Sequence, residues 1–288
     1  MGEKYLKDKD FSDFKDRSYQ SCVETLHLSS WDEFHKVIKI FFRHIDNSTD
    51  RYADYYIWRG QKEDLPLISN FYRKYKDLKK EDRKNELIRI LSTFKKRLSD
   101  LPNTLIDFRK LEDEDTIWTI GQHYGLITPL LDWTEVPYYA AYFAFYEKFQ
   151  NKKEDRIVYA LNLPEILRFK LKLKHPITKE VLEIKQFNFD RKFISPEQNQ
   201  RLINQKGTFT RDYENFKVEN ALQKIYESDT KNNPEKEKNY SKVVLTKILI
   251  PEKLQDECLS SLKSMNITHG SLFPDYAGAV EISKIDMA

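Results

Sequence analysis

A run of nine residues at positions 138–146 constrains the fold more than any other segment, because every residue in it is aromatic or alanine. Pro137 is tolerated in the first turn of a helix, and Thr134 is a candidate N-cap for that helix. A helix that is apolar nearly all round must be buried. We therefore expect this segment to be a helix in the interior of the protein.

Further segments show the periods of helices and strands. Ser30 and Glu33 have the spacing of a capping box, and the apolar residues after them recur at the helical period. We expect one helix that begins at residue 31 and two more over 80–99 and 116–123. A late helix is expected to carry Leu254, Cys258 and Leu262 on one face. The strands that we expect cover 55–58 (ending at Arg59), 156–163, 243–250 and 278–282, and 229–242 is expected to be a loop.

The order of these elements favours an α+β fold. Helices come first and mixed strands and helices follow, without the regular alternation of an α/β protein. We expect a mixed, mainly antiparallel central sheet flanked by helices. The first 25 residues are charged and aperiodic, so we predict an N-terminal arm over 1–25 and a single globular domain over 26–288.

Composition excludes several classes of protein. The 49 basic and 46 acidic residues leave a net charge of +3, which by itself does not predict nucleic-acid binding. The basic cluster at 95–97 is read as a solvated helix face. No segment has the length and apolarity of a membrane span, and the first residues do not read as a signal peptide, so we expect a cytoplasmic protein. Cys22 and Cys258 are isolated and should pack as small hydrophobic residues.

The seven glycines indicate where a site lies. Three of them adjoin polar residues suited to binding, namely Arg59 with Gln61, Gln122 with His123, and Gln205. No second ligand stands at metal-binding spacing from His123, so no metal is expected. The glycine-rich and nucleophile motifs of Rossmann enzymes, P-loop NTPases and α/β-hydrolases are absent from the sequence.

Three of these polar residues each have two interpretations. Asp132, between Leu131 and Trp133, either accepts backbone amides and pins its loop or orients His123 or Arg59. His123 is either a core or hinge histidine or a donor to a ligand. Arg59 is either paired with Asp132 or able to bind two phosphate oxygens.

Four blocks of the sequence resemble the FRG-domain family. They are WRGQ at 58–61, QHYGLITPLLDWT at 122–134, RLINQKGTF at 201–209 and LFPD at 272–275. Trp58 replaces the usual Phe or Tyr, and Pro129 stands where the family often has Arg. The blocks span nearly the whole chain, and the second is long and specific.

The resemblance implies a bacterial or phage-related protein, with toxins and defence effectors among its relatives. The order of the blocks is similar to that of ADP-ribosyltransferases, which split NAD. It implies catalytic roles for Arg59, His123 and either Gln205 or Asp275. The residues that it implies for contacts with NAD are Arg59, Gln61, Tyr124, Thr128, Asp132, Trp133 and Thr134.

Three functions follow as hypotheses. The first is an NAD-dependent ADP-ribosyltransferase-like toxin or phage-defence effector that modifies a protein or a nucleic acid. An antitoxin or regulatory partner would accompany it, and no membrane is involved. The second is a ligand- or nucleic-acid-binding module without catalysis, and the third is a metal-independent nuclease that uses His123 with Arg59.

Overall fold

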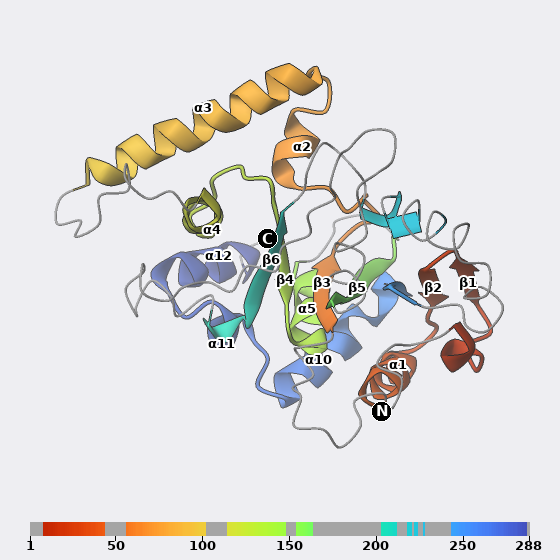
Figure 1. Ribbon diagram of the computed structural model, residues 1–288. Coiled ribbons are helices and arrows are strands. Elements are labelled where there is room, and N and C mark those ends of the chain that lie inside the picture. Colours follow the sequence, from red (N-terminus) through yellow and green to blue (C-terminus); the bar gives the residue numbers. More distant parts are fainter. Residues whose placement is uncertain are drawn as a thin grey trace.

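The computed structural model describes residues 8–43, 56–101, 114–147, 154–163, 203–211, 218–220, 222–223, 227 and 243–286. Its strands are β1 (Arg17–Gln20), β2 (Val23–His27), β3 (Tyr56–Gln61), β4 (Leu130–Thr134), β5 (Arg156–Asn162), β6 (Gly207–Arg211) and β7 (Leu245–Ile250). Its helices are α1 (Trp31–Arg43), α2 (Asn70–Lys74), α3 (Lys80–Ser99), α4 (Glu114–His123), α5 (Pro137–Phe145), α10 (Gln255–Ser264), α11 (His269–Leu272) and α12 (Tyr276–Asp286). Two short 3₁₀ helices, η1 (Asp8–Phe11) and η4 (Glu252–Leu254), complete the described elements (Figure 1).

One mixed sheet forms the centre of the protein, in the order β1-β2-β7-β5-β3-β4-β6. Among these strands only β2 and β7 pair in parallel, and the other neighbours are antiparallel. This confirms the predicted α+β class with a mixed, mainly antiparallel sheet.

The sheet includes part of the segment that we expected to be an arm. Residues 17–20 and 23–27 are β1 and β2, and Val23 pairs with Leu245 of β7. Charge obscured this hairpin in the sequence, because β1 is an edge strand whose side chains are only partly covered. The described part of the N-terminus therefore belongs to the sheet from residue 17 onward.

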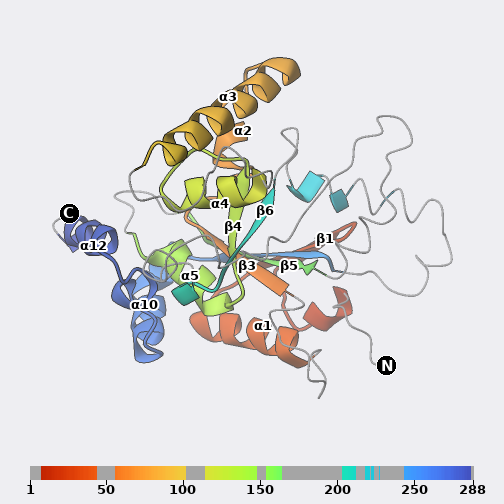
Figure 2. The ribbon, with the colours of Figure 1, turned by 60° about the vertical axis from the view of Figure 1, so that its left-hand side comes forward.

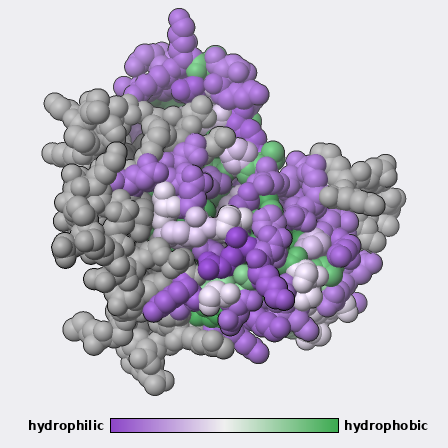
Figure 3. All heavy atoms as spheres, turned by 90° about the vertical axis from the view of Figure 1, so that its right-hand side faces the viewer, coloured by the Kyte–Doolittle hydropathy of each residue, from purple (hydrophilic) through white to green (hydrophobic). Residues whose placement is uncertain are grey.

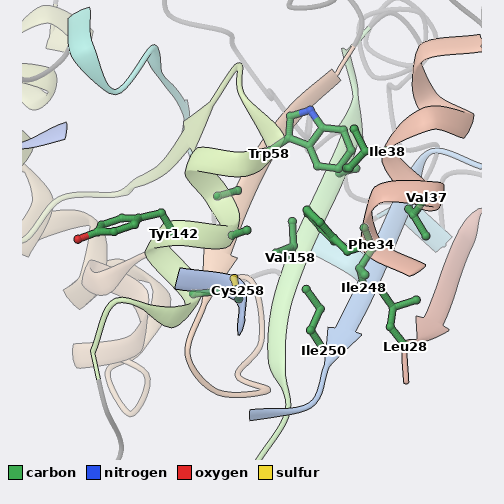
Figure 4. Close-up of a cluster of buried hydrophobic side chains, with 14 of the residues drawn as sticks. Leu28, Phe34, Val37, Ile38, Trp58, Tyr142, Val158, Ile248, Ile250 and Cys258 are labelled. Atoms are coloured by element: carbon green, nitrogen blue, oxygen red, sulfur yellow. The ribbon is translucent and has the colours of Figure 1, made fainter. Parts of the chain in front are cut away.

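Helices α1, α5 and α10 cover one face of the sheet. Phe34 and Ile38 of α1 lie with Trp58, Val158 and Ile248 of the strands in one buried cluster (Figure 4). Helix α5 is enclosed as predicted, with Ala140, Ala141, Ala144 and Phe145 each fully buried. Gly60 makes this packing possible, since a Cβ at that position would lie 1.9 Å from the Ala140 carbonyl oxygen.

The opposite face of the sheet carries a second, smaller cluster. On that face, strands β3, β4 and β5 contribute to one buried cluster the side chains of Ile57, Leu131, Trp133 and Tyr159. A separate cluster joins α3 and α4 to β4 and β6, and α3 runs along the outside of the molecule (Figure 2). The bounds of α3 are those that the sequence predicted.

Three further elements differ from the prediction. Strand β3 continues through Arg59 to Gln61, because β5 pairs with it along its whole length. Residues 130–134 form strand β4 rather than a loop, paired with β6. Residues 276–286 form helix α12, so the predicted strand at 278–282 is wrong.

Local hydrogen bonds explain where α12 begins, and the predicted N-cap of α5 is wrong. The Gly278 amide donates to the Asp275 carboxylate at 2.7 Å, which closes the first turn of α12. The N-cap of α5 is Val136 rather than Thr134. Thr134 ends β4, and its hydroxyl accepts from the Val136 amide at 3.2 Å.

The predicted capping box is half formed. The Ser30 hydroxyl accepts from the Glu33 amide at 3.3 Å, but the Glu33 carboxylate accepts from the Ser29 amide instead.

Both cysteines are buried and unbridged, as predicted, and burial raises the pKa of the Cys22 thiol to about 12. No helix in the described part of the chain has the length and apolarity to cross a bilayer. The predicted loop at 229–242 lies outside the described residues.

Candidate functional site

A cavity of about 740 Å³ opens where β3 and β4 separate. The two strands share one residue pair, Trp58 with Thr134, and diverge beyond it. Residues from the β3 end, α2, the α4 end, β4, α5, β6 and the Phe273 turn line this pocket. The lining comprises Trp58, Arg59, Gly60, Gln61, Lys62, Glu63, Leu65, Asn70, Arg73, Gln122, His123, Asp132, Trp133, Thr134, Phe143, Tyr146, Gln205, Gly207, Phe209 and Phe273.

Arg59 bridges the gap between the two strands. Its Nη1 donates to the backbone carbonyl of Asp132 at 2.7 Å and lies 3.8 Å from the Asp132 carboxylate. Its Nε donates to the Gln61 side chain at 3.4 Å. The guanidinium thus occupies the place of a ladder hydrogen bond, and two of its five N–H donors are engaged in these contacts.

Asp132 is exposed to the pocket rather than buried. Its side chain is 58% exposed, although Leu131 and Trp133 on either side are buried. Side chains alternate along a strand, so its neighbours enter the core while Asp132 faces the other way. Asp132 is therefore accessible although apolar residues flank it, and of its two interpretations the orienting of Arg59 agrees with the geometry.

Gln122 and Thr128 hold the Asp132 carboxylate in place. Gln122 donates its side-chain amide to Asp132 Oδ2 at 2.8 Å. The Thr128 hydroxyl donates to the Gln122 carbonyl oxygen and accepts from the Leu130 amide at 3.2 Å. Thr128 is fully buried and does not line the pocket, so it orients Gln122 instead of contacting a ligand.

A second guanidinium group, that of Arg73, faces the same cavity. Its helix α2 is positioned by the Phe71 amide, which donates to the Thr128 carbonyl at 3.2 Å. Arg73 itself donates to the Pro66 and Ile68 carbonyls at 3.4 and 3.3 Å. Burial lowers the pKa of Arg59, the Asp132 carboxylate opposes that shift, and the charge of Arg73 adds to the lowering. An anion between the two arginines would relieve their repulsion.

An aromatic wall closes another side of the pocket. Phe143 and Tyr146 lie one helical turn apart at the end of α5, and Phe273 packs edge-on to Phe143 with ring centroids 5.9 Å apart. Lys62 lies over the Tyr146 ring, 5.0 Å from its centroid, and forms an ion pair with Glu147. His269 stacks on Phe273, with ring centroids 4.4 Å apart.

The two candidates for the late catalytic group have different positions. Gln205 lines the pocket, but its side-chain amide donates to the Leu272 carbonyl at 3.1 Å and its own backbone carbonyl accepts from Thr134. Asp275 does not line the pocket, because its carboxylate caps α12. The LFPD block therefore contributes Phe273 to the cavity, and its acid serves the helix.

The remaining predicted residues are divided between the pocket and its surroundings. Gln61, His123, Trp133 and Thr134 line the cavity. The Trp133 ring points away into the core and donates to the Thr210 hydroxyl at 2.8 Å. Tyr124 is 60% exposed and does not line the pocket.

Sequence reasoning missed Arg73 and the aromatic wall. A signal existed for Phe143 and Tyr146, because residues three apart share a face of a helix. No local pattern pointed to Arg73, which sits on a five-residue helix between two loops.

Charges of both signs face the cavity, but no metal centre is built from them. The lining contains Arg59, Lys62 and Arg73 against Glu63 and Asp132. Within the described ranges, no three His, Cys, Asp or Glu side chains come together as ligands for a metal ion.

Comparison with known proteins gives one match. The family model of the FRG domain matches residues 54–153, a stretch from β3 to beyond α5. No curated protein and no solved structure matches the chain. Gln205 and Phe273 lie beyond the matched stretch, so the pocket combines the matched segment with later parts of the chain.

Proposed function

We propose that the chain, whose residues 54–153 match the family model of the FRG domain, binds NAD in the β3–β4 pocket and transfers ADP-ribose to a macromolecule. The protein would act as a bacterial toxin or phage-defence effector. One observation carries this proposal: two arginines and an accessible carboxylate share a cavity with an aromatic wall. The cavity volume of about 740 Å³ lies within the range of small-molecule sites.

The arginines suit the diphosphate of NAD. Arg59 is fixed by Asp132 and Gln61, and its remaining donors can bind phosphate oxygens. Arg73 provides a second positive charge from α2. A diphosphate between them would offset the charge repulsion that, together with the larger effect of burial, lowers the pKa of Arg59.

The aromatic wall suits a flat heterocycle. The rings of Phe143, Tyr146 and Phe273 can pack against nicotinamide or adenine, and offset or edge-on contacts are the favoured geometries. His123 adds a polar group within the same cavity, where ribose hydroxyls can be bound, whereas the Thr134 hydroxyl is engaged with Gln205 and Val136.

The chemistry needs a negative charge near the reacting carbon. The bond between C1′ of the ribose and the nicotinamide nitrogen breaks, and nicotinamide leaves as a neutral base with the electron pair. A bond forms between C1′ and the acceptor's nucleophilic atom, which loses its proton. In this proposal the Asp132 carboxylate, which accepts from Gln122, stabilises the positive charge that develops at C1′ and takes that proton.

Release of nicotinamide and transfer of label from radiolabelled NAD test the proposal. Wild type should release nicotinamide, and Arg59→Lys should release far less, because lysine keeps the charge but cannot replace the planar fork. Thermal unfolding of Arg59→Lys checks that the β3–β4 junction is retained. Equal turnover by a folded Arg59→Lys variant would refute the role of Arg59.

A binding module without catalysis is the second candidate, favoured by one observation. Gln205 and Asp275, the two residues expected to supply a late catalytic group, both have structural hydrogen bonds. NAD binding without any release of nicotinamide would favour this candidate.

A further inference from the structure

Positive charge is concentrated in one part of the chain. Residues 73–100 contain eleven Lys and Arg and five Asp and Glu, a net charge of +6. The whole chain has a net charge of +3, so the other residues together carry −3. The segment comprises the end of α2, the following turn and α3.

Helix α3 leaves most of its surface to solvent. It packs on α4 through Leu91 and Leu98, which lie in one buried cluster with Ile117 and Trp118. Exposed cations extend from Lys79, at the start of the helix, to Lys96 near its end. At a rise of about 1.5 Å per residue, these two lie about 25 Å apart along the helix axis. We call six of the exposed cations of this segment the α2–α3 basic surface, namely Lys74, Lys76, Lys79, Lys84, Lys96 and Arg97.

This basic surface begins at the rim of the pocket. Arg73 lines the cavity and Lys74, its neighbour in α2, is exposed. The Tyr75 hydroxyl donates to Glu86 of α3 at 3.0 Å, and Arg83 donates to the Lys76 carbonyl, so α2 and α3 are tied together. In Figure 1 both helices lie along the top of the molecule, and in Figure 3 the uppermost part is covered by hydrophilic residues.

The distribution of charges fits a phosphate backbone better than a membrane. An interfacial helix keeps one continuous apolar face for lipid, but Leu91 and Leu98 of α3 are packed on α4, and Ile88 is the single large apolar residue of α3 that is exposed. Cations spaced along a projecting helix match a polymer whose charges repeat along its length, and counterion release then drives binding.

We propose that the α2–α3 basic surface binds the phosphate backbone of a nucleic acid and presents it to the pocket as the acceptor of ADP-ribose. The acceptor role rests on the proposed function, whereas the binding itself does not. The shared chemistry is the phosphate backbone, so DNA and RNA are distinguished by experiment.

The test measures fluorescence anisotropy of labelled oligonucleotides of about 20 residues: duplex DNA, duplex RNA and single-stranded RNA. The variant carries Lys79→Gln, Lys84→Gln, Lys96→Gln and Arg97→Gln, none of which lines the pocket. The matched control carries Lys36→Gln, Lys39→Gln, Lys253→Gln and Lys263→Gln, which remove the same charge from exposed sites on α1, η4 and α10.

We expect the α3 variant to bind at least one oligonucleotide about 10-fold or more weakly than the control. Its slope of log affinity against log salt should also fall by about 0.7–0.9 for each phosphate that the variant no longer neutralises. Equal affinities of variant and control, or no binding by wild type, would overturn the proposal. A defect confined to anionic lipid vesicles would overturn it in favour of a membrane.

NAD titration separates this proposal from the proposed function. The α3 variant should bind NAD as the wild type does, because its substitutions lie outside the pocket. Oligonucleotide binding without NAD binding would remove the proposed function and leave the basic surface, and the reverse result would remove the basic surface alone.

Discussion

Arg59 shows how one side chain can both complete a sheet and prepare a site. Its guanidinium donates to the Asp132 carbonyl where the two strands diverge, and its charge stays beside the Asp132 carboxylate. The alternation of strand β4 explains why that acid is accessible while Leu131 and Trp133 are buried. The residues of this pair could be predicted from the sequence, but the pleat that exposes the acid could not.

Asp132→Asn should lower nicotinamide release by about 100-fold, because it removes the charge that would stabilise the transition state. The Asn carbonyl oxygen can still accept from Gln122, so the affinity for NAD should change by no more than about threefold. Steady-state turnover together with NAD titration checks both values. Unchanged turnover would show that Asp132 is not the reacting carboxylate.

Gly60→Ala should destabilise the protein by about 1–3 kcal/mol or prevent folding, since its Cβ would overlap the Ala140 carbonyl. Gly270→Ala is the matched control, because a Cβ there meets nothing within 4 Å. Urea unfolding of both variants measures the difference. Equal stabilities would contradict the close packing of α5 on β3.

At the scale of elements, strong periodicity made several predictions correct. Helix α3 and strands β5 and β7 have long apolar patterns, and their positions were predicted well. Strand β4 has five residues with an acid at its centre, so the sequence shows no clear alternation of apolar and polar residues there. Helix α12 was mistaken for a strand because Val280 and Ile282 alternate with Glu281, whereas the Asp275 cap sets the helix start.

Asp275→Ala should lower the free energy of unfolding by about 1 kcal/mol, the usual cost of losing an N-cap. Asp275→Ser should recover most of that loss, because serine also caps helices. NAD affinity should be unaltered in both variants, as Asp275 does not line the pocket. Loss of NAD binding with stability intact would instead place Asp275 in the site.

Glu86 joins α2 to α3 and gives a pH-dependent signal. Hydrogen bonds from Arg89, and then from Tyr75, lower the pKa of Glu86 from 4.5 to about 2. A lowered pKa means that the carboxylate stabilises the folded state above pH 4.5 and that this contribution fades as the pH falls toward 2. The difference in Tm between wild type and Glu86→Gln should therefore shrink between about pH 6 and about pH 3. A difference that stays constant over that range would contradict the lowered pKa.

At the scale of the whole molecule, the pocket unites residues from position 58 to position 273. Neither the single Trp58–Thr134 pair nor the parallel pairing of β2 with β7 leaves a local signal in the sequence. Composition and periodicity predicted the α+β class, and the resemblance pointed to residues of three separate blocks that line the pocket. Arg73 and the aromatic wall needed the three-dimensional arrangement, because each depends on contacts between distant segments.

Isothermal titration with NAD tests the central claim most directly, using wild type, Arg73→Ala and Lys74→Ala. The two variants remove neighbouring cations of α2, and only Arg73 lines the pocket. We expect wild type and Lys74→Ala to bind NAD alike and Arg73→Ala to bind at least about 10-fold more weakly, since it removes a charge-assisted hydrogen bond. Equal binding by all three proteins, or no binding by the folded wild type, would contradict an NAD site between β3 and β4.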